Sequence, residues 1–108
     1  MTTVHITPRA ASVVLRIRSE RRGRLTFTIE GGCCEGTAPH LFEDAVLTPG
    51  AEKVGEVEGV AVYLQPAMIP MYAGADVTID VIDEPLSDAM SLETGYGLRF
   101  VLREAATH

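Results

Sequence analysis

The chain has 108 residues, of which 46% are hydrophobic and 22% charged, and its net charge is −6. This length predicts one domain over residues 1–108, and the ordinary composition excludes a wholly disordered chain. No apolar run approaches the roughly 20 residues that span a bilayer, and the N-terminus lacks a signal pattern, so we expect a cytoplasmic protein without membrane contact. Cysteines in that compartment are reduced, which favours ligands, reactive thiols or packing over a structural disulfide.

Charge is unevenly distributed along the chain. Six of the nine basic residues are arginines that precede Leu25, and Glu20 is the only acid among them, so residues 1–24 carry +5 and the remainder −11. The negative net charge argues against nucleic acid as a partner, and no aromatic residue interleaves with the arginines to stack on bases. The arginines therefore either steer an acidic partner or form a solvated helix face.

The first third of the chain predicts a strand followed by a helix. We expect residues 3–6 to form a short strand. Thr7 followed by Pro8 is typical of a helix start, because threonine caps the first turn and proline needs no hydrogen-bond partner there. Apolar residues at helical spacing extend the helix over residues 8–21, and Gly23 ends it.

The rest of the chain predicts mainly strands. Strict alternation over residues 24–30 predicts a half-buried strand that Gly31-Gly32 breaks. We expect residues 37–53 to be irregular and residues 54–64 to form one strand or a hairpin bent near Gly59. The further predicted elements are a linker or helical turn at 65–71, a strand at 75–83, a loop at 84–88, strands at 90–93 and 98–102 joined by a loop at 95–97, and a frayed tail after 104. This order predicts an α+β domain with one N-terminal helix on a mostly antiparallel sheet.

Both cysteines lie in one glycine-rich stretch. Gly31-Gly32-Cys33-Cys34-Glu35-Gly36 follows the predicted strand, and Pro39-His40 closes the segment. Glycine permits unusual backbone angles, so the neighbouring sulfurs can converge on one ion. A tetrahedral ion needs further ligands, which His40 or the cysteines of a second copy would supply. The sequence therefore predicts a metal site with Cys33, Cys34 and His40 as ligands, holding zinc, iron or a 2Fe–2S cluster.

Other roles for the cysteine pair stay open. Neighbouring Cα atoms lie about 3.8 Å apart, below the roughly 4.4–6.8 Å of ordinary disulfides, so a Cys33–Cys34 bridge would be strained and easily reduced. Free cysteines often only pack in a core. A catalytic thiol needs a base, for which His40 is the nearby candidate.

Two segments resemble a bacterial family of small proteins described as domain of unknown function 779. They are the cysteine stretch continued to Pro39 and Ser91-Leu92-Glu93-Thr94-Gly95-Tyr96-Gly97-Leu98-Arg99-Phe100. The likeness extends over nearly the whole chain. Members of this family are often encoded beside aldehyde dehydrogenases, so the resemblance implies an accessory protein with an aldehyde dehydrogenase as its partner.

The order of elements also resembles the HesB-like A-type iron–sulfur carriers, over residues 4–102. In those carriers a cysteine in a Gly-Cys loop is one cluster ligand, a position that Cys33 or Cys34 matches. Two more ligands come from a Cys-Gly-Cys near the C-terminus, where this chain has no cysteine. The resemblance implies a HesB-like architecture of helix and packed sheets.

We therefore expect a small, non-enzymatic accessory protein that binds a metal or an iron–sulfur cluster through its Gly-Gly-Cys-Cys stretch and forms a homodimer. The alternative is a redox-sensitive binding partner of an aldehyde dehydrogenase that holds no metal. A thiol-dependent enzyme is a third interpretation, which predicts one cysteine far more reactive than the other.

Overall fold

The computed structural model describes residues 2–32, 36–84 and 91–104. Within these residues seven strands form two sheets, with the orders β1-β6-β7 and β3-β2-β5-β4. In chain order the elements are β1 (Thr3–Ile6), α1 (Pro8–Glu20), β2 (Leu25–Gly32), β3 (Gly36–Glu43), β4 (Glu52–Val57), β5 (Val60–Leu64), η1 (Pro66–Met68), α2 (Ile69–Tyr72), β6 (Asp76–Asp83), η2 (Leu92–Tyr96) and β7 (Leu98–Glu104).

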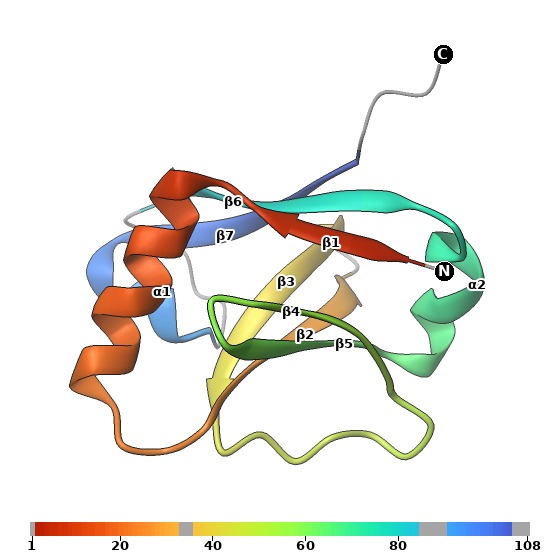
Figure 1. Cartoon of the computed structure of the whole chain (residues 1–108), viewed down its shortest axis with the longest axis horizontal. Helices are drawn as coiled ribbons and strands as arrows, with labels where there is room; N and C mark the ends of the chain where they lie inside the picture. The colour runs from red at the N-terminus through yellow and green to blue at the C-terminus, as the bar shows by residue number, and fades with distance from the viewer. Residues whose placement is uncertain (1, 33–35, 85–90, 105–108) are drawn as a thin grey trace.

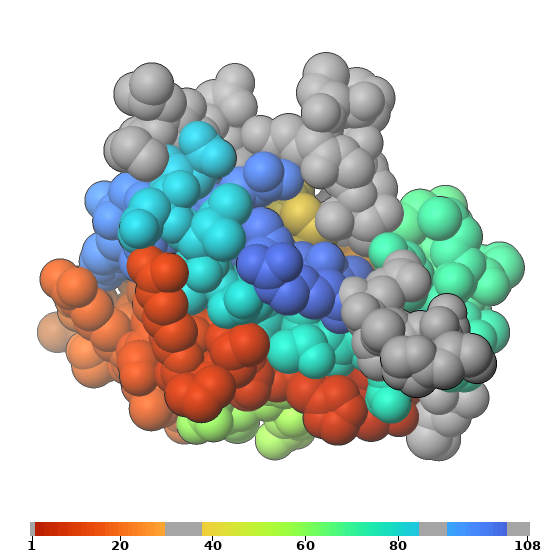
Figure 2. Space-filling model, turned by 90° about the horizontal axis from the view of Figure 1, so that it is seen from above, coloured from red at the N-terminus to blue at the C-terminus, as the bar shows by residue number. Residues whose placement is uncertain are grey.

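Both sheets are mixed. The pairs β1–β6 and β2–β5 are parallel, whereas β2–β3, β4–β5 and β6–β7 are antiparallel. Edge strands of the two sheets also meet, since β1 contacts β4 and β3 contacts β7. The sheets therefore curl around a shared interior, with α1 beside them (Figure 1). Figure 2 looks onto the three-stranded sheet, where red β1, cyan β6 and blue β7 lie side by side.

The interior is built from the alternating apolar residues of the strands. Phe27 of β2 and Phe100 of β7 are fully buried and meet edge to face, with ring centroids 5.0 Å apart. This contact joins the two sheets, and such aromatic pairs add to the stabilisation from buried area. The predicted inward faces of β5 and β6 are confirmed, because Val60, Val62, Leu64, Val77, Ile79 and Val81 are all buried.

Helix α1 begins as its sequence predicts. The Thr7 side-chain oxygen accepts the Ala10 N–H at 3.2 Å, and Pro8 occupies the first turn. The apolar stripe of Ala10, Val14 and Ile17 is fully buried, so the arginines lie on the opposite, solvated side. None of the helices in the described part of the chain is long and apolar enough to cross a membrane.

Three predictions about local structure are wrong. Strand β2 continues through Gly31 and Gly32 because pairing with β3 needs only the backbone. Residues 37–43, the start of the segment expected to be irregular, belong to β3, which accommodates Pro39 because it is the edge strand of its sheet. Leu92 and Glu93, which end the predicted strand at 90–93, instead begin η2, where the Thr94 N–H donates to the Ser91 carbonyl.

Other predictions hold or lie beyond the described ranges. Residues 54–64 are a hairpin, and its turn at Glu58 and Gly59 has the two positive φ angles (50° and 75°) of a tight hairpin turn. The helical turn at 65–71 is confirmed by η1 and α2. The cysteine stretch from 33 to 35, most of the predicted loop at 84–88, and the tail after 104 lie outside the described residues.

Candidate metal centre at the β2–β3 hairpin

The β2–β3 hairpin extends past the rest of its sheet. Strand β2 pairs with β5 only as far as Ile29, opposite Leu64, whereas its pairing with β3 continues to Gly32, opposite Gly36. After Leu64 the chain turns away, and the Gln65 N–H donates to the Ile29 carbonyl at 3.3 Å. The last three residues of β2 therefore form a two-stranded extension, about 10 Å long at the usual rise of a strand.

Cys33 and Cys34 follow directly at the end of this extension. They belong to the three residues, 33–35, that connect Gly32 to Gly36 and lie outside the described residues. The flanking backbone is fixed by the Gly32–Gly36 and Gly31–Thr37 pairs. In the chain, the predicted ligands thus directly follow the last residue pair of the β2–β3 hairpin. Their role as ligands stays a prediction.

His40 lies within β3 rather than in a loop. It pairs with Thr28, and its ring meets Phe42 edge to face with centroids 6.1 Å apart. Since Leu41 is fully buried, the alternation of the strand turns the half-buried His40 away from the core. Four residues of extended strand, about 13 Å, separate His40 from Gly36. The strand therefore does not bring the His40 backbone to the hairpin end, and its role as a ligand stays a prediction.

The described residues hold no group of three His, Cys, Asp or Glu side chains arranged to bind a metal ion. This finding does not extend to the cysteine pair.

A buried polar cluster that the sequence analysis missed fastens β3 to η2 and β7. Ser91 and Glu93 are only 4% and 1% exposed. The Leu41 N–H donates to Ser91 Oγ at 2.7 Å, the Ser91 hydroxyl donates to Glu93 Oε1, and the Phe100 N–H donates to Glu93 Oε2 at 2.8 Å. Both residues lie in the segment 91–100 that resembles the family, and this resemblance was the only sign in the sequence that they matter. Through Leu41 they fix β3, the strand that follows the cysteine pair in the chain.

Burial raises the pKa of Glu93 above its ordinary value. Hydrogen bonds from Phe100 and Ser91, together with the nearby His40, act in the opposite direction but do not cancel the loss of hydration. Glu93 thus favours its proton more strongly in the folded protein than an exposed glutamate does.

Comparison with known proteins places this arrangement in a family. A family model described as Domain of unknown function (DUF779) matches residues 14–105. No match was found among functionally curated proteins.

Three solved structures share the fold. IscA, solved with a 2Fe–2S cluster, is 19% identical with a TM-score of 0.54, and the match covers 94% of this chain and 85% of IscA. SufA of Escherichia coli, which is involved in biosynthesis of iron–sulfur clusters, is 14% identical with a TM-score of 0.55, covering 98% of this chain and 83% of SufA. A protein from Aquifex aeolicus is 20% identical with a TM-score of 0.53, covering 95% and 92%.

These neighbours confirm the α+β, HesB-like architecture that the sequence resemblance implied. At such identities they establish the fold alone. The family model, by contrast, extends over most of the chain and both of its characteristic segments. The protein therefore belongs to the DUF779 family, and its fold is that of the HesB-like carriers.

Proposed function

We propose that this protein is a small accessory protein that binds a metal ion or an iron–sulfur cluster through the thiolates of Cys33 and Cys34. The observation that carries the proposal is the position of the cysteine pair. It follows Gly32, where β2 and β3 still pair beyond the end of β5. The fold that presents it is shared with IscA, which was solved with a 2Fe–2S cluster.

The number of ligands supports a site shared between two chains. Each chain has two cysteines, whereas structural zinc sites and 2Fe–2S clusters take four protein ligands. The extension of the hairpin past β5 supports this arrangement, because two such ends can approach each other without a clash between sheets. We propose a homodimer in which two cysteine pairs provide four sulfurs, with His40 as the alternative source of a ligand.

Purification without oxygen, followed by metal analysis and an ultraviolet–visible spectrum, tests this function. We expect about one zinc ion or one cluster per two chains, as four-sulfur coordination requires. The Cys33→Ala and Cys34→Ala variants should both lose it. His40→Ala, compared with the matched control His5→Ala, shows whether the imidazole contributes, since His5 lies beside Asp76 on an exposed face.

Wild-type protein without stoichiometric metal would overturn the proposal. That result would favour a redox-sensitive partner of an aldehyde dehydrogenase. Co-purification with such an enzyme, or a change in its activity on addition of this protein, would then be the deciding observation.

A further inference from the structure

An arginine-lined cavity lies at the opposite end of β2 from the cysteine pair. Its volume is about 340 Å³, and it is lined by three arginines and by Gly23, Leu25, Gly59 and Val60. The arginines are Arg18, Arg22 and Arg24. Among the described residues no acidic side chain contributes to this lining. Strand β2 runs from Leu25 to Gly32, so about 23 Å of extended chain separates the cavity from the predicted metal site.

Arg18 is held in the cavity by the turn between β4 and β5. Its Nη1 donates to the Glu58 carbonyl at 2.8 Å. A Cβ atom at Gly59 would lie only 2.9 Å from the same nitrogen, and the φ angle of Gly59 is +75°. Glycine is thus needed both for the turn and for the approach of the guanidinium. The remaining N–H groups of Arg18 are available to a ligand, because a guanidinium carries five donors.

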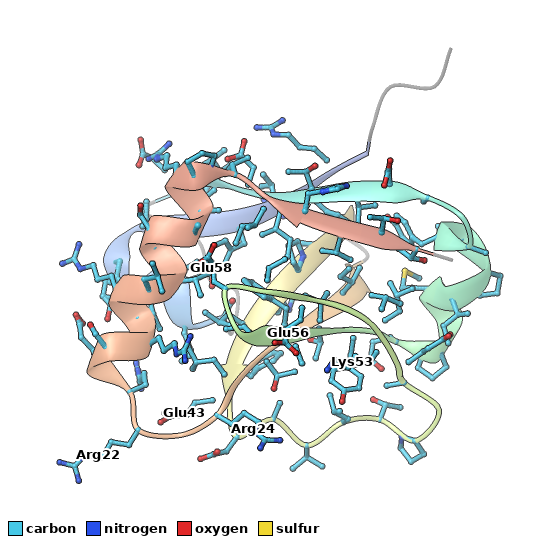
Figure 3. The ribbon with its side chains drawn as sticks, viewed as in Figure 1. Arg22, Arg24, Glu43, Lys53, Glu56 and Glu58 are labelled. Atoms are coloured by element: carbon cyan, nitrogen blue, oxygen red, sulfur yellow. The ribbon has the colours of Figure 1, made fainter. Side chains whose placement is uncertain are left out.

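The backbone of Arg24 is held by two hydrogen bonds to Asp44. Its N–H donates to Asp44 Oδ1 at 3.0 Å, and its carbonyl accepts the Asp44 N–H at 2.7 Å. Arg22 lies two residues earlier, on the link between α1 and β2, and its side chain points outward, away from that of Arg24 (Figure 3). Neither guanidinium forms an ion pair within the described ranges. The side-chain charges of Arg22 and Arg24 are therefore not paired directly with any carboxylate of the described residues, although Asp44 accepts the Arg24 backbone N–H.

The carboxylates nearest to these arginines already have other partners. Glu43 accepts the Gly23 N–H at 2.8 Å and lies 3.5 Å from the Arg21 guanidinium. Asp44 accepts the backbone N–H of Arg24. Elsewhere the arginines are neutralised locally, as the pairs Arg9–Asp83, Arg16–Glu20 and Arg103–Asp80 show. Three arginines and no acidic side chain of the described residues thus line the cavity, while the carboxylates of Glu43 and Asp44 lie beside it at Gly23.

We propose that this cavity binds the phosphate group of a small molecule, either inorganic phosphate or a phosphate ester. The planar guanidinium matches phosphate oxygens in a bidentate manner, and Arg18 and Arg24 each offer such a group from the lining of the cavity. An adjoining hollow shares Arg24, Leu25 and Gly59 and is further lined by Lys53, Glu56, Ala61 and Tyr63. Lys53 and Glu56 form an ion pair at 3.2 Å there. This hollow leaves room for the organic part of an ester beside an aromatic ring. The site is independent of the proposed metal centre.

Titration of the protein with inorganic phosphate, followed by amide NMR, tests the proposal at constant ionic strength set with chloride. We expect saturable shifts of the Gly23, Arg24 and Gly59 amides. Arg24→Gln is the decisive variant, because it keeps the backbone bonds to Asp44, and Arg18→Gln is the second. Each should weaken binding about tenfold, the effect of losing a charge-assisted hydrogen bond. Arg9→Gln, which removes the same charge beside Asp83, should leave the affinity unchanged.

Two results would overturn the proposal. One is linear shifts that never saturate and that chloride reproduces. The other is equal weakening in Arg9→Gln and Arg24→Gln, which would indicate only the overall charge. A parallel titration with glycerol 3-phosphate assigns the ligand class: tighter binding than inorganic phosphate indicates an ester held by the adjoining hollow, and equal binding indicates free phosphate.

Discussion

Glu93 shows how a single side chain can join two sheets. Its carboxyl group accepts the Phe100 N–H from β7 and the Ser91 hydroxyl, and Ser91 in turn holds the Leu41 N–H of β3. At 1% exposure, the group stabilises the fold only while these hydrogen bonds outweigh its desolvation. The direction in which the pKa of Glu93 shifts determines how its contribution to folding stability depends on pH. Because the folded pKa is raised above the ordinary value of 4.5, the stabilisation is full below that value and is lost as pH rises through the folded pKa.

Two substitutions at Glu93 separate charge from hydrogen bonding. Glu93→Gln keeps an acceptor for the Phe100 N–H without a buried charge, so its free energy of unfolding should match or exceed the wild-type value at neutral pH. Glu93→Ala leaves buried donors unpaired and should cost about 2–4 kcal/mol. Chemical denaturation from acidic to neutral pH measures both effects. A Gln variant that keeps the wild-type pH slope, or that loses as much stability as the Ala variant, would contradict this account.

At the level of elements, the sequence pattern correctly predicted those helix starts, strands and turns that are determined by neighbouring residues. The Thr7-Pro8 start of α1, the alternation of β6 and the bend at Gly59 are local signals, and each is confirmed. Gly31 and Gly32 were wrongly predicted to end the strand. Glycines disfavour a strand by themselves, but here they are held in β2 by backbone pairing with β3. The strand at Pro39 was missed for a related reason. Proline is tolerated there because β3 is an edge strand, and the position of a strand in its sheet is known only from the assembled fold.

The turn between β4 and β5 allows backbone strain to be separated from ligand binding. Gly59 and Gly74 have nearly equal φ angles, +75° and +76°, but only Gly59 lies against Arg18, whereas a Cβ at Gly74 would meet nothing within 4 Å. Alanine at either position should cost about 1–2 kcal/mol, because both adopt the left-handed region. Only Gly59→Ala should also weaken phosphate binding, since it displaces the Arg18 guanidinium. Denaturation and phosphate titration of the two variants check this, and an equal loss of phosphate affinity in both would contradict it.

At the level of the whole molecule, β2 runs between the two proposed sites, one for a phosphate and one for a metal. Its first residue borders the arginine cavity, and its last precedes the cysteine pair. The cysteine stretch and the excess of arginines were identified from the sequence, because both are clusters of one residue type within a short part of the chain. It did not show which arginines lack a carboxylate, nor that Ser91 and Glu93 are buried, because these properties arise from contacts between residues far apart in the chain.

X-ray absorption spectroscopy at the metal edge of anaerobically purified protein shows whether Cys33 and Cys34 are metal ligands. We predict sulfur neighbours at about 2.3 Å for zinc, with four sulfurs per ion in the homodimer and none in Cys33→Ala or Cys34→Ala protein. A first coordination sphere of nitrogen and oxygen alone, or a sulfur signal unchanged by both substitutions, would contradict the account.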